Sequence, residues 1–290
     1  MDNKRESWTA VLLAGQRPGP DPLASSFGEH YKALIPICGE PMVDRVLACL
    51  LQSPAVDKVI LLGQEPGLLL NVPLAEKLGA GRVVALPSRA GIAESIADVL
   101  RDPSLRWPVL VTTADHPLLT PEIVADFLDG ARGGDIAIGV VERATVLDRY
   151  PDARRTWLRF SDGAYSGANL FAMRSARVQY ALDLWSRAEK DRKQAFKLFW
   201  HFGPVLAIRA ILRMIGFRRA LARAGARLGL DARLVVLRHA DAAIDVDKLS
   251  DHRLVEKILR ARHDESGPGT IETRPGMPET AEAEASANKA

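Results

Sequence analysis

The residues best suited to chemistry lie near the start of the chain. An apolar run, Trp8–Ala14, ends in Gly15, and Arg17 and Gly19 follow in a short loop. Glycines let backbone N–H groups approach a polyphosphate closely, and Arg17 together with Lys32 would neutralise its charge. A short apolar run ending in glycine is typical of the first strand of an α/β domain. The stretch therefore predicts a phosphate-binding site; the alternative is a strand followed by an ordinary surface loop.

Two common phosphate-binding loops are excluded by the spacing. A Walker loop contains Gly-Lys-Ser or Gly-Lys-Thr, and the chain has no such run. A dinucleotide-binding loop requires G-x-G-x-x-G, and residues 14–19 lack its second glycine and carry Pro18 near the expected helix start.

Two later stretches supply carboxylates that a metal ion would need. Asp115 follows the apolar run 108–114, and Asp245 and Asp247 lie close together near the end of the chain. Mg²⁺ is usually held by one or two protein carboxylates together with phosphate and water. The alternatives are that Asp115 caps a turn and that Asp247 or Ser250 is a helix N-cap.

The elements that must position these residues alternate along the chain. We expect strands at about 8–14, 58–63, 82–87, 108–115 and 135–141, and helices at 39–52, 91–100 and 121–131. Residues 68–78 are ambiguous. Such alternation predicts a mainly parallel sheet with helices on both faces, with its active site beyond the carboxyl ends of the strands. Two strands, 156–160 and 164–174, a helical region to about 228, a strand at 233–237 and a helix at 250–262 complete the chain.

The motifs together resemble those of a known family. The run from Lys32 to Met42 reads KALIPICGEPM and follows a Leu-Ala-Gly loop containing Arg17. It resembles the signature of nucleotidyltransferases with a molybdenum-cofactor-guanylyltransferase-like, GT-A-type fold, which include sugar-phosphate and polyol-phosphate cytidylyltransferases. The first loop is shorter here than in the common family form. Asp115-His116-Pro117 and the stretch 243–251 resemble two further family motifs.

The resemblance implies a fold and a domain organisation. It covers residues 8–174 and 232–262, and implies a Rossmann-like, three-layer α/β sandwich. We expect a nucleotidyltransferase domain over residues 1–262, with a helical insertion at about 175–230. The tail at 263–290 is dominated by Gly, Pro, Glu, Ala and Ser, which is typical of disorder.

The resemblance also implies roles for individual residues. Lys32, Arg17 and Asp115 would be catalytic, and Asp115 would hold Mg²⁺ with Asp247, or with Asp245 as the alternate ligand. The nucleotide and acceptor would be contacted by Ala14, Gly15, Gln16, Gly19, Gly91, Ser95, Ser166, Gly167 and Asn169. The alternatives are a plain helix start at Gly91 and Ser95, and a bulged strand around Gly167.

The activity implied is a Mg²⁺-dependent transfer from an NTP to a phosphorylated small acceptor, with release of pyrophosphate and with CTP or GTP as the first candidates. Two rival functions stay open at this point. One is a GT-A-type glycosyltransferase, although Asp115-His116-Pro117 differs from the Asp-x-Asp strand end usual in those enzymes. The other is a non-catalytic nucleotide-binding protein that acts through its basic helices.

Composition indicates the class and compartment of the protein. The 290 residues are 47% hydrophobic, which supports a sizeable core, and a net charge of +3 does not indicate nucleic acid as a partner. The two cysteines, Cys38 and Cys49, have apolar sequence neighbours and are expected to be buried thiols. Neither a signal peptide nor an apolar run long enough to span a membrane is evident, so we expect a cytoplasmic protein.

The helical insertion carries an unusual combination of residues. Arginines recur every four or five positions, at 209, 213, 218, 223 and 227, which predicts a basic stripe on one helical side. Phe196, Phe199, Trp200 and Phe202 precede Pro204. The segment 195–228 therefore suits peripheral membrane contact, a lid over an anionic acceptor, a homodimer contact or a solvated basic face.

Overall fold

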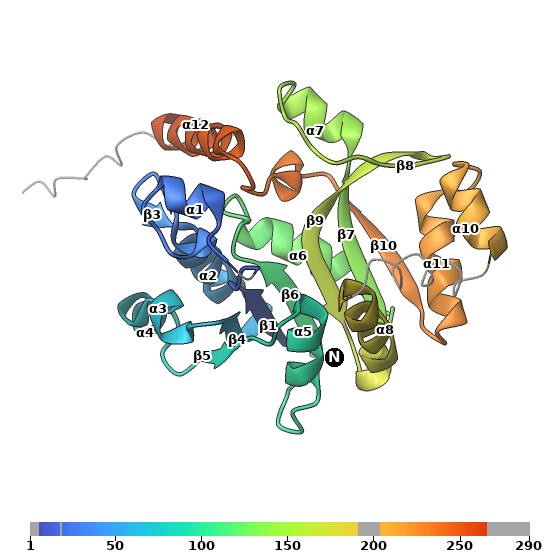
Figure 1. Ribbon diagram of the computed structural model, residues 1–290, viewed down its shortest axis with the longest axis horizontal. Coiled ribbons are helices and arrows are strands. Elements are labelled where there is room, and N and C mark those ends of the chain that lie inside the picture. Colours follow the sequence, from blue (N-terminus) through green and yellow to red (C-terminus); the bar gives the residue numbers. More distant parts are fainter. Residues whose placement is uncertain (1–5, 18, 191–203, 266–290) are drawn as a thin grey trace, which may run out of the picture.

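The computed structural model describes residues 6–17, 19–190 and 204–265. Most strands form one sheet of order β10-β7-β9-β6-β1-β4-β5, with β8 paired to β9, and helices pack on both faces (Figure 1). Its strands are β1 (Trp8–Leu13), β4 (Val56–Gly63), β5 (Val83–Pro87), β6 (Val109–Thr113), β7 (Ile136–Glu142), β8 (Leu158–Phe160), β9 (Gly163–Met173) and β10 (Ala232–Leu237).

The sheet is mainly parallel, as the alternating pattern predicts. β1 pairs in parallel with β4 and β6, β4 with β5, and β10 with β7, whereas β9 runs antiparallel between β6 and β7. Because β1 and β6 are parallel neighbours, the residues that follow Leu13 and Thr113 emerge at the same edge of the sheet.

The helices are α1 (Pro22–Ser26), α2 (Met42–Gln52), α3 (Pro66–Leu69), α4 (Val72–Gly79), α5 (Ile92–Leu100), α6 (Pro121–Gly130), α7 (Arg143–Arg149), α8 (Gln179–Lys190), α10 (Pro204–Ile211), α11 (Phe217–Arg227) and α12 (Leu249–Glu265). Short 3₁₀ turns lie at Lys32–Leu34 (η1), Ala176–Val178 (η2) and Ala240–Ala243 (η3).

Side-chain alternation along the strands divides the core into layers. In β1, Ala10 and Leu12 pack with α2 and α6 on one face, whereas Val11 packs with α5 and α8 on the other. A smaller cluster in which α11 packs on β10 extends the second face. The β1 strand is therefore buried on both faces, which explains why its sequence is continuously apolar.

The positions expected for the elements differ from those observed in several places. The ambiguous segment 68–78 forms the short helices α3 and α4, separated at Leu70 and Asn71, with Pro66 and Pro73 each in a first helical turn. The helices α1 and α7 were not expected. The last helix, α12, runs to Glu265 and so extends three residues beyond the expected end at Arg262.

The arginines of the insertion do not form one continuous stripe. α10 ends at Ile211, Arg213 has a positive φ of 55°, and α11 begins only at Phe217. The single-sided stripe expected from the spacing is wrong because this break divides the arginines between two helices. The aromatic residues at 196–202 lie outside the described residues.

Cys38 is also not buried, contrary to the sequence-based expectation. It is exposed, whereas Cys49 is buried in α2. Cys38 and Gly39 both have positive φ and join the two-residue strands β2 (Pro36–Ile37) and β3 (Glu40–Pro41). A two-residue hairpin loop with this backbone projects its first side chain outward, whatever the polarity of its sequence neighbours.

Among the helices that the structure describes, none combines the length and apolar character needed to cross a membrane.

A core substitution tests the layered packing. Phe127 of α6 is fully buried, and its ring lies against Gly139 of β7 at a distance that leaves no room for a Cβ there without movement. We expect Phe127→Ala to lower the free energy of unfolding in urea by about 3–5 kcal/mol, because it removes a large apolar group and leaves a cavity. Val72→Ala, at a site 51% exposed, is the control and should change it by less than about 1 kcal/mol. Equal, small effects of both substitutions would contradict the packing.

Candidate active site

The site lies at the carboxyl ends of β1 and β6. Ala14 and Gly15 leave β1, and Asp115 leaves β6 after Thr113 and the buried Ala114. The Ala114 amide donates to the Leu13 carbonyl at 2.8 Å, so the two strand ends are joined beyond the sheet. The Thr113 hydroxyl donates to Asp115 Oδ1 at 2.6 Å and fixes the direction of that carboxylate.

Lys32 joins two carboxylates that are far apart in the sequence. Its Nζ lies 2.7 Å from Asp115 Oδ2 and 2.5 Å from Asp247 Oδ1. Lys32 begins the 3₁₀ turn η1, and its neighbours Ala33 and Ile35 are buried, which anchors the backbone on both sides of the ammonium group. The structure thus brings together the lysine and two of the three acidic residues predicted from sequence.

The electrostatics of this cluster favour the charged forms of Lys32 and Asp115. Burial disfavours the Asp115 carboxylate, but the Lys32 charge and the Lys32 and Thr113 hydrogen bonds outweigh it and lower the pKa of Asp115. Burial likewise opposes the charged form of Lys32, but Asp115 and Asp247 outweigh it and raise the Lys32 pKa. At neutral pH Lys32 is therefore an ammonium cation and Asp115 a carboxylate.

A second set of hydrogen bonds holds the Asp247 loop against β6. The Val246 amide donates to the Asp115 carbonyl at 2.9 Å. The Asp251 carboxylate accepts from the amides of Asp247 at 3.1 Å and Lys248 at 3.0 Å. Asp251 thereby satisfies backbone donors at the start of α12, so the Asp247 side chain is free of that capping role and reaches Lys32.

Asp245 has different partners. Its carboxylate forms an ion pair with the Arg155 guanidinium and accepts from the Asn169 side-chain amide at 3.1 Å. Arg155 also donates to the Asp245 carbonyl at 3.2 Å. Asp245 therefore does not join Lys32 and Asp115, although only Val246 separates it from Asp247, because its carboxylate is held by Arg155 and Asn169.

The β9 strand contributes the other residues predicted for the acceptor side. Its register against β7 shifts between Ile138 and Val140, and Asn169 there has a positive φ of 51°. The bulged strand that the sequence analysis gave as the alternative is present, and the Asn169 side chain there donates to Asp245. Ser166 is buried and Gly167 is exposed, opposite Val141 and Val140 respectively.

Gln16 organises the loop after β1. Its side chain donates to the His30 carbonyl at 2.9 Å and accepts from the Lys32 amide at 3.2 Å, so it links the loop to Lys32. The Gln64 side chain pairs with the Gln16 backbone, at 3.2 Å to its amide and 2.7 Å from its carbonyl. A Cβ at Gly15 would lie 3.1 Å from Gln64 Oε1, so this close approach favours glycine.

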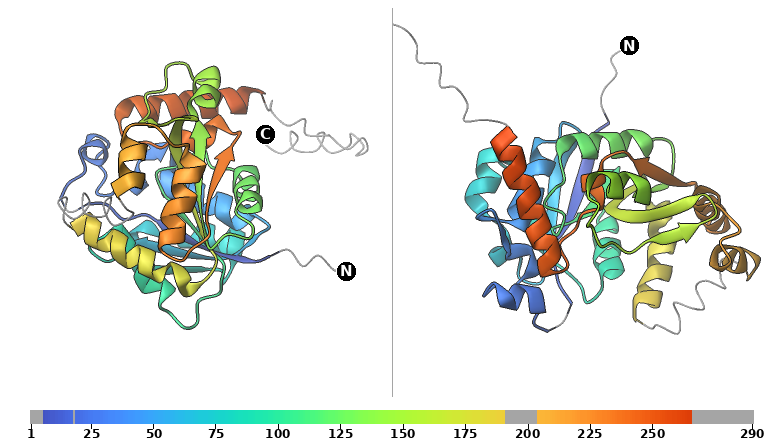
Figure 2. Two further views of the ribbon diagram at one scale, coloured as in Figure 1. Left: turned by 90° about the vertical axis from the view of Figure 1, so that its right-hand side faces the viewer. Right: turned by 90° about the horizontal axis from the view of Figure 1, so that it is seen from above.

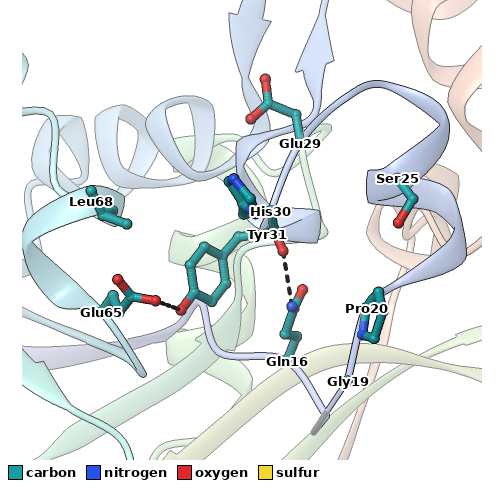
Figure 3. A pocket seen from close by; sticks show the side chains of 9 residues that line it. All are labelled: Gln16, Gly19, Pro20, Ser25, Glu29, His30, Tyr31, Glu65 and Leu68. Atoms are coloured by element: carbon teal, nitrogen blue, oxygen red, sulfur yellow. Dashed lines mark hydrogen bonds between the residues drawn. The ribbon is translucent and has the colours of Figure 1, made fainter.

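Two cavities border this loop, and both are lined by Gln16, Gly19 and Tyr31. One, of about 580 Å³, also contains Pro20, Ser25, Glu29, His30, Glu65 and Leu68; Figure 3 shows its lining and the Tyr31 hydroxyl donating to Glu65. The other, of about 400 Å³, also contains Arg17, Gln64, Ser88, Arg89 and Ala90. The exposed Arg17 therefore faces a cavity at the ends of β1, β4 and β5.

Gly91 and Ser95 do not line either cavity. The Ser95 hydroxyl donates to the Gly91 carbonyl at 2.7 Å and accepts from the Arg89 amide at 2.9 Å, which shapes the turn that carries Arg89 and Ala90. The Glu189 carboxylate of α8 accepts from the Ile92 and Ala93 amides at the start of α5. In this structure the two residues position the cavity wall.

His116, which the sequence analysis leaves outside the catalytic set, is fully buried beside the site. Its Nε2 lies 3.2 Å from the Asp241 carbonyl, and burial lowers its pKa so that the imidazole is neutral. The Asp241 carboxylate in turn accepts from Tyr150 and Arg262. These contacts tie η3 and α12 to the segment after β6.

The donor set fits a magnesium ion. Asp115 and Asp247 direct one oxygen each at a single cation, the Lys32 ammonium, so their carboxylates already converge. Two carboxylates completed by phosphate oxygens and water are an ordinary Mg²⁺ environment. Within the described residues no group of three or more His, Cys, Asp or Glu side chains is arranged to hold a metal without such help.

Three contributors were missed from the sequence. Gln64 and Thr113 lie at the carboxyl ends of strands next to β1, and that position was a signal available from the strand pattern. Arg155 lies in an irregular segment between α7 and β8, and no local pattern connects it with Asp245, which is 90 residues away.

Comparison with known proteins agrees with this geometry. The sequence profile of the MobA-like NTP transferase domain matches residues 10–267. A hypothetical transferase structure from Thermus thermophilus is 30% identical, with a TM-score of 0.71 over 85% of this chain and 99% of that chain. No match was found among curated proteins.

Two further solved structures share the fold at lower identity. The 4-diphosphocytidyl-2C-methyl-D-erythritol synthase of Anaerococcus prevotii is 12% identical, with a TM-score of 0.52 over 88% of this chain and 96% of that chain. A CMP:2-keto-3-deoxy-manno-octonic acid synthetase in complex with CTP is 15% identical, with a TM-score of 0.51 over 88% of this chain and 100% of that chain.

The domain match extends over most of the chain, and the predicted loop, lysine and carboxylates meet at one edge of the expected sheet. The chain therefore belongs to the family with the MobA-like NTP transferase domain and is a nucleotidyltransferase.

Proposed function

We propose that the enzyme joins an NTP, with CTP or GTP as the first candidates, to a phosphorylated small acceptor and releases pyrophosphate. The observation that carries this proposal is the Lys32 ammonium group between Asp115 and Asp247, next to the glycine-containing loop. The arrangement offers positive charge, a pair of metal-binding carboxylates and backbone amides, which are the groups that phosphoryl-type transfer requires.

The nucleotide would lie along the loop from Ala14 to Gly19. Arg17, Gln64, Ser88 and Arg89 line the cavity at the ends of β1, β4 and β5, where polar and cationic groups suit a ribose and polyphosphate. The two structurally similar enzymes that handle cytidine nucleotides support a cytidine nucleotide here, and the resemblance to molybdenum-cofactor guanylyltransferases leaves GTP as the alternative.

Asp115 and Asp247 would hold Mg²⁺, which supplies neutralisation of phosphate charge when it is bound. Lys32 would then be released from its two ion pairs and would donate to an α-phosphate oxygen of the nucleotide. Beside the negative charge of the phosphates the ammonium group stays protonated near neutral pH, so its contribution is electrostatic.

The acceptor would lie against β9, where Asn169 donates to Asp245 and Ser166 and Gly167 precede it on the same strand. Arg155 offers a guanidinium that Asp245 orients and that matches a phosphate group. We therefore assign Asp245 to positioning Arg155 and Asn169 and keep Asp247 as the second metal ligand.

The reaction itself requires no strong base. An acceptor phosphate oxygen is already ionised near neutral pH and attacks the α-phosphorus of the NTP. The bond between that phosphorus and the bridging oxygen breaks, and pyrophosphate leaves with the electron pair. Arg17, in the exposed part of the loop, would neutralise the leaving group, and the acceptor is joined through a new phosphoanhydride bond.

The direct experiment measures pyrophosphate released from each of the four NTPs in the presence of a panel of sugar, polyol and amino-alcohol phosphates. We expect release with one NTP, only when an acceptor and Mg²⁺ are both present. Release of a nucleoside diphosphate from a nucleotide sugar, without pyrophosphate, would instead identify a glycosyltransferase.

Removing the Asp115 carboxylate tests the proposed metal site. We expect Asp115→Asn to lower turnover more than about a hundredfold, because a bound metal contributes several kcal/mol to the transition state. Circular dichroism should show an intact fold. Asp148→Asn, at an exposed position of α7, is the control and should retain full activity. Near-full activity of Asp115→Asn would overturn the assignment.

The two neighbouring aspartates should behave differently. Asp247→Asn should raise the Mg²⁺ concentration needed for half-maximal rate, because it removes a metal ligand. Asp245→Asn should leave that concentration unchanged and raise the acceptor KM, because it loosens Arg155. Steady-state kinetics with Mg²⁺ and acceptor varied in turn distinguish these effects, and a metal effect in Asp245→Asn alone would reverse the two roles.

Substitutions of Lys32 and Arg17 should affect different kinetic constants. Lys32→Ala should lower kcat more than it raises any KM, because its charge matters most as the α-phosphate reacts. Arg17→Ala should chiefly raise the KM for the NTP. Arg132→Ala, in an exposed ion pair with Asp129, is the matched control. Changes in melting temperature alone, with kinetics unaltered, would show that the loop is structural.

A further inference from the structure

A helical hairpin beyond the β10 edge of the sheet has no role in the proposed reaction. It consists of α10, α11 and the connection between them, residues 204–228, and we refer to it as the basic hairpin. It lies at the opposite end of the sheet from β5, α3 and α4, and away from α12 and the loop after β1 (Figures 1 and 2).

The basic hairpin is firmly attached to the domain through one side. Phe217 stacks on Phe160 at 4.2 Å between ring centroids and contacts Tyr165. The Asp162 carboxylate accepts from the Phe217 amide at 3.0 Å, and Ile215, in the connection, is buried. The conformation of the connection is therefore set by contacts with the β8–β9 turn.

Local hydrogen bonding also fixes the C-terminal end of α10. The Met214 amide donates to the Arg209 carbonyl at 2.7 Å, and Arg213 between them has a φ of 55°. This six-to-one bond across a left-handed residue is a Schellman-type helix end, which closes α10 in a fixed geometry.

The outer side nevertheless exposes large aliphatic groups. Ile208, Ile211, Leu212 and Met214 are 47%, 65%, 61% and 65% exposed, although Ile215 beside them is only 4% exposed. These four are neighbours on the last turns of α10 and on the connection. A fixed backbone that presents several aliphatic side chains together marks a surface for an apolar partner.

The same hairpin is strongly and purely basic. Arg209, Arg213, Arg218, Arg219, Arg223 and Arg227 are all exposed, and residues 204–230 contain no Asp or Glu. None of these guanidinium groups has an ion-pair partner among the residues that the structure describes. The partner must therefore combine negative charge with an apolar interior.

We propose that the basic hairpin docks the enzyme on an anionic lipid membrane. Aliphatic groups would enter the boundary between headgroups and acyl chains, and the arginines would contact anionic headgroups. A nucleic acid would satisfy the charge but offers no apolar phase for Ile211 and Leu212. Because the hairpin lies beyond the β10 edge, docking leaves the carboxyl ends of β1 and β6 open to substrates.

Co-sedimentation of the full chain with vesicles tests the proposal. We expect binding to phosphatidylcholine vesicles that contain phosphatidylglycerol, and much weaker binding to phosphatidylcholine alone. Raising the salt to about 0.5 M should weaken binding, since it screens the headgroup charge.

Two double variants separate the contributions of charge and apolar contact. Arg209→Gln with Arg213→Asn should lower the partition coefficient about 25-fold, at about fivefold for each arginine. Asn is chosen at 213 because it tolerates a positive φ. Ile211→Gln with Leu212→Gln should lower it at least about tenfold at unchanged charge.

The control substitutions lie on the surface outside the basic hairpin. Val72→Gln replaces an exposed aliphatic residue of α4, and Arg132→Gln replaces an exposed arginine after α6; both should bind vesicles like the original chain. Pyrophosphate release with soluble substrates should be unchanged in all four variants, so failure of the docking proposal and failure of the proposed reaction are distinguishable.

Three results would overturn the proposal. One is no binding to anionic vesicles at low salt. Another is that the chain binds duplex DNA as tightly as anionic vesicles and that the double variant Ile211→Gln with Leu212→Gln binds both unchanged. That result would indicate a general polyanion-binding site. The third is that the original chain is a dimer that does not bind vesicles and that the same double variant is a monomer in sedimentation velocity. That result would show that a second copy of the chain covers the aliphatic surface.

Discussion

The Lys32 ammonium group, held between Asp115 and Asp247, is the interaction on which the rest of the site depends. Asp115 and Asp247, which are 83 and 215 residues from Lys32 in the sequence, both lie within hydrogen-bonding distance of it. Neither carboxylate would lie so close to the other without a cation between them, because like charges at this distance repel strongly in a partly buried setting. The lysine therefore organises the site before substrate arrives.

The sheet explains how such a cluster is maintained. β1 and β6 are buried parallel neighbours, and their carboxyl ends present Gly15 and Asp115 side by side. The Asp247 loop is tied to the same edge by the Val246 amide and by Asp251. Since the layers on both faces are packed, this edge cannot shift without disrupting the core.

The separation of Asp245 from Asp247 shows how one short motif serves two sides of a site. Within residues 244–247, the Asp247 carboxylate points toward Lys32 and the Asp245 carboxylate points toward Arg155 and Asn169, because each is held by its own partners. The first direction suits the nucleotide and metal, and the second suits the acceptor. A single loop can thus hold the two halves of the reaction in a fixed relation.

The sequence by itself determined the fold class, the order of most elements and the residues at strand ends. Apolar runs of strand length, followed by Gly15 or Asp115, carry their structural meaning locally, so they could be read without neighbours. A bulged strand around Gly167 was one of two interpretations that the sequence allowed, because a glycine within a strand favours irregular backbone, and the positive φ of Asn169 agrees with it.

Only the tertiary structure decided which residues meet. It selected Asp247 over Asp245 for Lys32, brought Arg155 to Asp245, and placed Gln64 beside Gly15, all through contacts between distant segments. It also divided the arginine stripe, because Ile215 and Phe217 pack on the β8–β9 turn and interrupt a pattern that continues in the sequence. Periodicity describes one element at a time, whereas burial and charge pairing depend on what the fold brings next to it.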